Sequence, residues 1–252
     1  MLLSLLWSAV GLYVLLCVAL FALQSRMLYL PQFTRATAAE TDFALEREGL
    51  VLRGWRVNPG KPAALLYFGG NAEAIGMQRE DFARWFPDRT VYLLAYRGFG
   101  ASDGSPSEAA LKADALALFD HVRAQHTDIS VLARSVGTGI GIHLAAAREI
   151  SRLGLITPYD SLRAVATAHY PWFPVRWLLR EPYDSMPLAA QVGWPTLLLI
   201  ARFDEVIAPA HAERLAAAFP SKPQIVYLDT DHNGVEQDGR FELALRKFFA
   251  VK

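Results

Sequence analysis

The chain of 252 residues is long enough for one sizeable domain, because a single hydrophobic core is still stable at this length. Its 25 basic and 25 acidic residues cancel and form no Lys/Arg-rich block, which excludes the basic surface typical of a nucleic-acid-binding protein. The single cysteine, Cys17, excludes an intrachain disulfide and a zinc site built from several thiolates, and leaves the redox compartment open.

The first segment, Met1–Ser25, contains no charged side chain and is rich in Leu, Val and Ala. About 20 such residues, at roughly 1.5 Å each, cross a hydrocarbon core of about 30 Å, so we predict a transmembrane anchor. The alternative is a cleaved signal peptide, but no basic residue precedes the run and the run is long. The bulky Leu16 before Cys17 argues against a lipoprotein. Because Arg26 and Arg35 follow the span, the positive-inside rule favours a cytoplasmic position for the remainder, although two arginines leave the side uncertain.

After a polar connector around Gln32–Thr41, short apolar runs alternate with longer amphipathic ones, which is typical of an α/β fold. Several short runs are apolar on both faces, so we expect a mostly parallel central sheet with helices on both sides. The predicted strands are Phe43–Glu48, Leu50–Val57, Ala63–Phe68, Val91–Ala95, Ile129–Ala133, Leu153–Ile156, Thr196–Ala201 and Gln224–Leu228. The predicted helices are Ala74–Phe86, Glu108–Ala124, Gly139–Ile150, Ala208–Phe219 and Phe241–Ala250.

The segment Asp160–Val192 interrupts this alternation between two sheet strands. It contains Tyr170-Pro171-Trp172-Phe173-Pro174, followed by Trp177-Leu178-Leu179. We predict a small cap above the sheet, whose aromatic side chains either line an apolar pocket or simply fill core.

The most informative stretch is a strand that stops at Ser135 and opens at once into a glycine-rich helix. Such a sharp turn lifts a serine hydroxyl above the sheet, and it needs small residues on both sides because the two backbone arms nearly touch. The usual pattern is Gly-x-Ser-x-Gly, and here Ala133 occupies the first glycine position. An ordinary helix N-cap would explain Ser135, but not Gly137 and Gly139 so close behind it.

The same glycines also suggest a dinucleotide-binding fingerprint. Gly141 falls one residue early for Gly-x-Gly-x-x-Gly. The acidic residue expected about 20 residues on could only be Asp160, which three residues separate from the end of the next predicted strand. The pattern therefore favours a nucleophile elbow over a nucleotide site.

A serine nucleophile needs a histidine base, and the histidine needs an orienting carboxylate. Both follow in the order that this kind of fold requires: Asp204 comes just after the strand Thr196–Ala201, and His232 lies in the loop before the last helix. Asp160, after a different strand, is the reserve candidate for the acid. The competing histidines lie on or near predicted helices or in the cap, and they are His121, His126, His143, His169 and His211.

Negative charge that develops on a substrate carbonyl oxygen requires fixed hydrogen-bond donors, each worth roughly 3–4 kcal/mol in the transition state. Backbone N–H groups supply them in this kind of site: one from Val136, directly after the serine, and one from the turn Gly69-Gly70-Asn71-Ala72-Glu73. We predict Asn71 as the donor in that turn. The alternative is that the glycines only make a strand-to-helix turn.

Taken together, these motifs resemble the α/β-hydrolase superfamily, in particular its membrane-anchored, serine aminopeptidase-like branch of hydrolase-domain proteins. The resemblance runs from about Met27 to the C-terminus. Two positions depart from the family pattern, Gly69 where a histidine is common and Ala133 where a glycine is common. The motifs that carry the resemblance are Gly69–Ala72, Tyr96–Gly104, the Ser135 elbow, Thr157–Ser161 and the Asp204 and His232 loops.

The resemblance implies an anchor over residues 1–25 and an α/β-hydrolase domain over residues 26–252, with the cap at about 160–192. It further implies a serine hydrolase that cleaves an ester or related acyl bond of a small-molecule or lipid-like substrate through an acyl-enzyme. A serine peptidase and a non-catalytic, membrane-associated binding protein remain alternatives. We expect no metal, no organic cofactor and no nucleic-acid partner.

Overall fold

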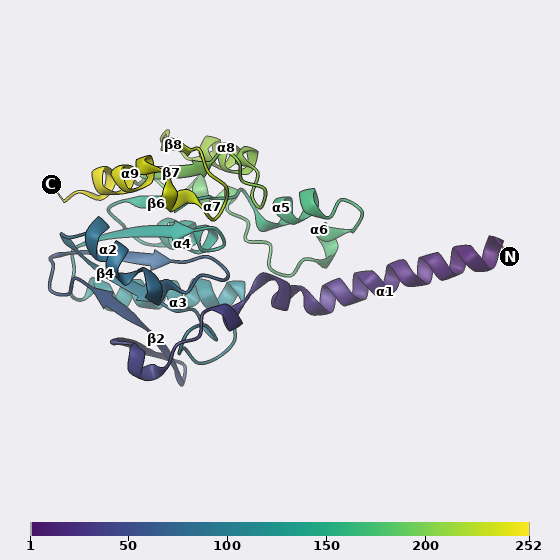
Figure 1. Ribbon diagram of the computed structural model, residues 1–252, viewed down its shortest axis with the longest axis horizontal. Coiled ribbons are helices and arrows are strands. Elements are labelled where there is room, and N and C mark those ends of the chain that lie inside the picture. Colours follow the sequence, from purple (N-terminus) through teal and green to yellow (C-terminus); the bar gives the residue numbers. More distant parts are fainter. Residues whose placement is uncertain (1, 252) are drawn as a thin grey trace.

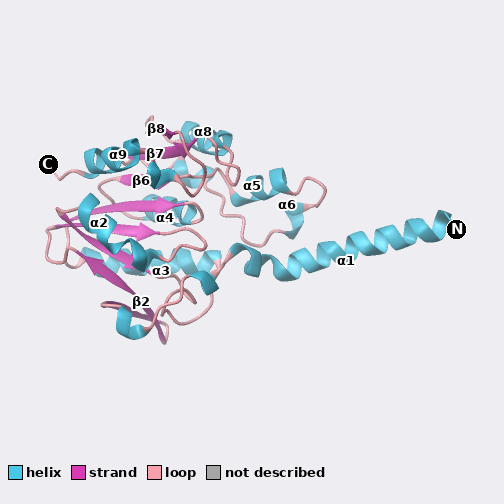
Figure 2. Cartoon of the chain, in the orientation of Figure 1, coloured by secondary structure: helices cyan, strands magenta, loops and turns pink. Residues whose placement is uncertain are grey.

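The computed structural model describes residues 2–251 (Figures 1 and 2). Its strands are β1 (Phe43–Arg47), β2 (Leu50–Val57), β3 (Ala63–Phe68), β4 (Arg89–Leu94), β5 (Asp128–Arg134), β6 (Leu153–Ile156), β7 (Thr196–Ala201) and β8 (Gln224–Leu228). They form one eight-stranded sheet in the order β1-β2-β4-β3-β5-β6-β7-β8. The β1–β2 and β2–β4 pairs are antiparallel and all others are parallel, so the predicted mostly parallel sheet is confirmed.

Burial explains why these segments are strands. Every residue of β3, β4, β6 and β7 is buried, as expected of strands covered on both faces. The prediction for β4 began two residues late because Arg89 and Thr90 look polar. In the structure Arg89 is only 2% exposed, and its guanidinium donates to the carbonyl oxygens of Ala64 and Phe249 and to the Asp128 carboxylate. A buried polar side chain that is fully hydrogen-bonded is tolerated in a strand.

Helices cover both faces of the sheet (Figure 1). On one face α2 contacts α9, and Trp85 packs edge-on against Phe241 with ring centroids 5.3 Å apart. On the other face α3 contacts α4, and α7 contacts α4 and α8. The bounds of these helices are α2 (Arg79–Trp85), α3 (Glu108–Arg123), α4 (Gly137–Ala147), α7 (Met186–Ala189), α8 (Pro209–Ala218) and α9 (Gly239–Phe249).

Two helix predictions are wrong by three or more residues at one end. The helix predicted over Ala74–Phe86 begins instead as a short 3-10 turn, Ile75–Gln78. The helix predicted to reach Ile150 stops at Ala147, because Arg148 takes an extended backbone with φ −139° and ψ 152°. The Arg148 guanidinium then donates to both carboxylate oxygens of Asp120 on the neighbouring α3. A tertiary contact therefore ends this helix.

The N-terminal helix α1 (Leu2–Leu28) projects away from the sheet domain, and its N-terminal end is the farthest point from it (Figures 1 and 2). None of its residues is buried. It belongs to the one segment among residues 2–251 that is long and apolar enough to cross a membrane, with mean hydropathy 2.4. The predicted cap lies between α1 and the sheet domain in Figure 1, and contains α5 (Leu162–His169) and α6 (Val175–Leu178).

Candidate active site

The turn between β5 and α4 holds Ser135 at the carboxyl edge of the sheet. Ser135 has a φ of +50°, a left-handed conformation that non-glycine residues rarely adopt, and its N–H donates to the Ile156 carbonyl at 2.9 Å. A Cβ added at Gly137 would lie 2.2 Å from the Phe68 carbonyl oxygen, so only glycine allows α4 to start this close to the end of β3. The strained turn and the close approach are the features expected of a nucleophile elbow.

Ala133 fits this elbow because a neighbouring glycine leaves room for it. Its side chain is fully buried, and a Cβ added at Gly141 would lie only 2.8 Å from the Ala133 Cβ. The methyl group that Ala133 adds is thus accommodated by the absence of one on the facing turn of α4. The departure from the Gly-x-Ser-x-Gly pattern does not disturb the turn.

The structure brings Ser135, His232 and Asp204 into one hydrogen-bonded chain. The Ser135 Oγ lies 3.0 Å from His232 Nε2, and His232 Nδ1 lies 2.7 Å from Asp204 Oδ2. The His232 and Asp204 residues are buried, with exposed fractions of 8% and 7%. Three side chains separated by 69 and 28 positions therefore meet at distances that allow proton transfer.

The turn after β7 fixes the carboxylate of this chain. Asp204 Oδ1 accepts the N–H groups of Val206 and Ile207 at 2.9 and 2.7 Å, which leaves Oδ2 for His232. Because one oxygen is tied to its own turn, the carboxylate cannot rotate away from the imidazole. The histidine is held in the orientation that presents Nε2 to Ser135.

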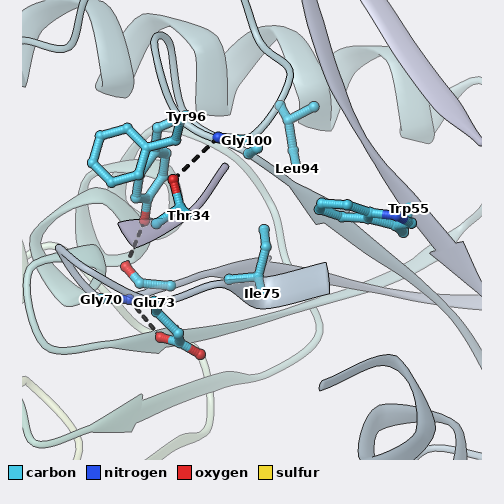
Figure 3. A pocket seen from close by; sticks show the side chains of 11 residues that line it. Thr34, Trp55, Gly70, Glu73, Ile75, Leu94, Tyr96 and Gly100 are labelled. Carbon is cyan, nitrogen blue, oxygen red and sulfur yellow. Dashed lines mark hydrogen bonds between the residues drawn. The ribbon is translucent and has the colours of Figure 1, made fainter. Parts of the chain in front are cut away.

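The loop after β3 is held from both sides (Figure 3). The Tyr96 hydroxyl donates to the Gly69 carbonyl at 2.8 Å, and the Gly70 N–H donates to Glu73 Oε2 at 2.6 Å. Glu73 Oε1 in turn accepts from the buried Tyr67 hydroxyl at 2.6 Å. A Cβ at Gly69 would lie 2.7 Å from the Ile75 side chain, so the histidine common in the family does not fit this packing. The hydrogen bonds to Tyr96 and Glu73 hold the loop in place instead.

Like those of the next residues, Ala72 and Gly137, the backbone N–H groups of Asn71 and Val136 donate to no protein acceptor within residues 2–251. They are the two donors predicted from the sequence, and both residues line the same cleft as Ser135. The Asn71 side-chain amide donates to the Leu28 carbonyl at 3.1 Å, and the Asn71 backbone carbonyl accepts the Leu30 N–H at 3.1 Å. The loop is therefore attached to the end of α1.

Arg134 is a residue of this site that the sequence reasoning missed. It directly precedes Ser135, and its guanidinium donates to Glu236 at 2.9 Å and to the Asn233 carbonyl, next to His232, at 3.4 Å. It also lies 3.9 Å from Glu73. Arg134 thus joins the elbow, the loop after β3 and the histidine loop. Only its position beside the serine could have indicated this.

The reserve acid Asp160 belongs to a different cluster. Its Oδ1 lies 2.7 Å from His211 Nδ1, and its Oδ2 accepts from Arg214 at 2.7 Å. Burial raises the pKa of Asp160, but hydrogen bonds from His211 and Arg214 outweigh it and hold the pKa below its usual value. Asp160 therefore has its own partners and makes no hydrogen bond to His232.

The site opens into a cleft of about 360 Å³ that includes Ser135, His232, the loop after β3 and side chains of the cap helix α5. Leu162, Val165 and Ile207 give one side of it an apolar wall. Within residues 2–251, no group of three or more His, Cys, Asp or Glu side chains could hold a metal ion. The chemistry offered by the described residues is that of a serine, an imidazole, a carboxylate and backbone donors.

Comparison with known proteins places this geometry in a family. No family model matches the chain. A hydrolase from Pseudomonas aeruginosa superposes with a TM-score of 0.67 over 85% of this chain and all of that one, at 21% identity. The enol-lactonase of Burkholderia xenovorans gives 0.66 over 82% of this chain and 99% of that one, at 18% identity. These likenesses show the fold.

An uncharacterized protein of Mycobacterium tuberculosis is 33% identical over 89% of this chain and 86% of its own length. The Arabidopsis thaliana α/β hydrolase domain-containing protein WAV2 is 28% identical over 72% of this chain and 67% of its own length. The chain belongs to the α/β-hydrolase superfamily. This α/β-hydrolase is also 30% identical to mouse lysophosphatidylserine lipase ABHD12 over 60% of its residues, but spans only 44% of that protein. The resemblance drawn from the motifs is confirmed.

Proposed function

We propose that this α/β-hydrolase cleaves an ester or related acyl bond with Ser135 as nucleophile, His232 as general base and Asp204 as the orienting acid. The observation that carries the proposal is the continuous hydrogen-bonded chain from the Ser135 hydroxyl through His232 to Asp204. A buried imidazole between a serine and a fixed carboxylate is the arrangement that activates a serine hydroxyl.

The proposed reaction is acyl transfer to water in two steps. His232 takes the proton of Ser135 as the oxygen attacks the acyl carbonyl, and then gives that proton to the leaving alcohol. A water molecule, deprotonated by the same histidine, then attacks the acyl-enzyme, and His232 returns that proton to Ser135 Oγ as the acyl–oxygen bond breaks and the carboxylic acid leaves. Asp204 stabilises the imidazolium that forms in each step.

We assign the oxyanion hole to the backbone N–H groups of Asn71 and Val136. Their freedom from protein acceptors supports this assignment, as does their position on the cleft that contains Ser135. The neighbouring Gly70 N–H is bonded to Glu73, which makes it a support for the loop rather than a donor to the substrate. Fixed donors of this kind need no reorganisation when charge develops on the oxygen.

We further propose that α1 anchors the enzyme in a membrane, with residues 1–25 as the anchor and 26–252 as the catalytic domain. The exposed and apolar surface of the helix, which carries no charge before Arg26, supports this, because such a surface is unfavourable in water. The relatives include a yeast protein named as a membrane protein and a lipase. A small-molecule or lipid-like acyl substrate is consistent with both.

Labelling with a fluorophosphonate probe tests the proposed nucleophile. The full-length enzyme should react at Ser135, and Ser135→Ala should lose the reaction. Ser221→Ala is the matched control, because Ser221 is exposed and lies outside the cleft. Equal labelling of wild type and Ser135→Ala would refute the nucleophile assignment.

A panel of substrates then distinguishes an esterase from a peptidase. Release of p-nitrophenol from acyl esters without release of p-nitroaniline from peptide anilides would support an esterase. The reverse pattern would favour a peptidase built on the same site.

A further inference from the structure

A second, apolar groove lies beside the catalytic cleft, between α1 and the cap. Its volume is about 320 Å³. One wall comes from α1 and includes Leu20 and Met27, and the other comes from the cap and includes Ala166 and Phe173. Among the side chains that line the groove, three can form hydrogen bonds, and they are Gln24, His169 and Tyr170. The groove therefore offers few partners to a polar ligand.

The groove adjoins the cleft that holds Ser135. Four residues line both spaces, and they are Leu28, Leu162, Val165 and Val206. A molecule that places its carbonyl beside Ser135 can therefore extend an apolar tail directly into the groove.

Hydrogen bonds and ring stacking hold the cap against α1 along the length of the groove. The Tyr13 ring stacks on Phe173 with centroids 5.8 Å apart, and its hydroxyl donates to the Trp172 carbonyl at 2.9 Å. Nearer the sheet domain, the Gln24 amide donates to the Leu178 carbonyl at 3.0 Å and accepts the Arg180 N–H at 2.7 Å. The cap is therefore attached to α1, the helix that we propose to be embedded in the membrane.

The outer surface of the cap carries two large aromatic side chains. Trp172 and Trp177 are each 82% exposed. Exposed tryptophans are unfavourable in water and are enriched at the interface between lipid and water. Because Trp172 accepts a hydrogen bond from Tyr13, about midway along α1, this tip of the cap reaches into the bilayer when α1 spans it.

We propose that the groove between α1 and the cap binds one long acyl chain, and that the chain enters it from the lipid bilayer. This proposal rests on the hydrolase function proposed above, and it makes the substrate an acyl ester with a long hydrocarbon tail. The bilayer is the source because one wall of the groove is the anchor helix itself. The ester carbonyl reaches Ser135 while the tail stays between apolar side chains.

A chain-length comparison tests the groove. The full-length enzyme, reconstituted in phosphatidylcholine vesicles, is assayed with p-nitrophenyl acetate and p-nitrophenyl palmitate. We expect Ala166→Phe, which fills the groove from the cap side, to lower the palmitate-to-acetate ratio of kcat/KM about tenfold, the equivalent of about two buried methylenes. Leu20→Trp, which narrows the groove from the α1 side, should lower the same ratio.

Ala168→Phe is the matched control. Ala168 lies on the same helix, is exposed and does not line the groove, so its substitution should leave the ratio within about twofold. An unchanged ratio in both groove variants, in samples that react with the fluorophosphonate probe, would overturn the acyl-chain site. If the wild type does not react with the probe, the proposed hydrolase function fails instead, and the two failures are distinguishable.

Dilution of the ester within the membrane tests the route of entry. At constant total p-nitrophenyl palmitate, added phosphatidylcholine should lower the rate as the mole fraction of ester in the bilayer falls. A rate that follows only the total concentration would overturn delivery from the bilayer.

Discussion

Two buried histidine–aspartate pairs lie at the carboxyl edge of this sheet, and in each the imidazole Nδ1 is 2.7 Å from a carboxylate oxygen. They differ in what surrounds them. In the pair His232–Asp204, the second carboxylate oxygen is held by backbone N–H groups, and the second imidazole nitrogen faces the Ser135 hydroxyl. In the pair His211–Asp160, the second oxygen is bound by Arg214, and no residue within 2–251 hydrogen-bonds the second nitrogen.

A His–Asp pair can act as a general base only where the free imidazole nitrogen faces a proton donor. In the pair His211–Asp160, the Arg214 guanidinium also lies 2.8 Å from the same His211 nitrogen that faces Asp160. That cluster joins α8 to the segment after β6 at the start of the cap. We interpret it as a structural link, and the predictions below test the division of roles.

The largest expected effect separates the two histidines. His232→Ala should lower kcat for an ester by about a million-fold, the scale seen when a triad base is removed. His211→Ala should leave kcat within about tenfold, because His211 does not contact Ser135. Steady-state assays with circular dichroism of both variants check this, and a comparable loss in the two would contradict the assignment.

The Asp204 and Asp160 carboxylates should differ in their effect on kcat in the same way as the two histidines. Asp204→Asn should lower kcat by about ten thousand-fold, because an amide no longer stabilises the imidazolium and favours the wrong tautomer. Asp160→Asn should change kcat far less. If Asp160→Asn instead produced the larger loss at pH 7, the reserve acid would have to be reconsidered.

Glu73 is a third carboxylate near the site, and it supports a loop without contacting an imidazole. Glu73→Ala frees the Gly70 N–H and should displace the neighbouring donor Asn71, so kcat should fall about a hundredfold, the scale of one lost oxyanion donor. KM should change little. Glu80→Ala on the exposed start of α2 is the control and should have no effect on either constant.

The smallest effect is on stability and its pH dependence. The pKa of Asp160 is lowered in the folded protein, so its charged form stabilises the fold above the ordinary carboxyl pKa, and this contribution is lost as the pH falls through the folded value. Asp160→Asn should therefore reduce the free energy of unfolding by about 2 kcal/mol at pH 7. The difference from wild type should shrink below about pH 4 in denaturant titrations.

Much of the architecture was predictable because it depends on local patterns. Strands β2, β3, β6, β7 and β8 have the predicted bounds, and of these β3, β6 and β7 are apolar runs buried on both faces. The start of β4 differs because of distant partners, the carbonyl and carboxylate groups that bind the buried Arg89. Chain order also indicated Ser135, Asp204 and His232, because a post-strand acid and a late loop histidine are what this fold requires.

The α/β fold, the elbow and an ordered set of candidate residues follow from the sequence, because hydrophobic periodicity and glycine positions act over short distances. Two aspartates follow two adjacent parallel strands, and either could have oriented a histidine. The packing of the folded chain selects which pairs meet, places Glu73 and Arg134 beside the site, and encloses a groove between α1 and the cap. These outcomes depend on packing between segments far apart in the chain, which no local pattern encodes.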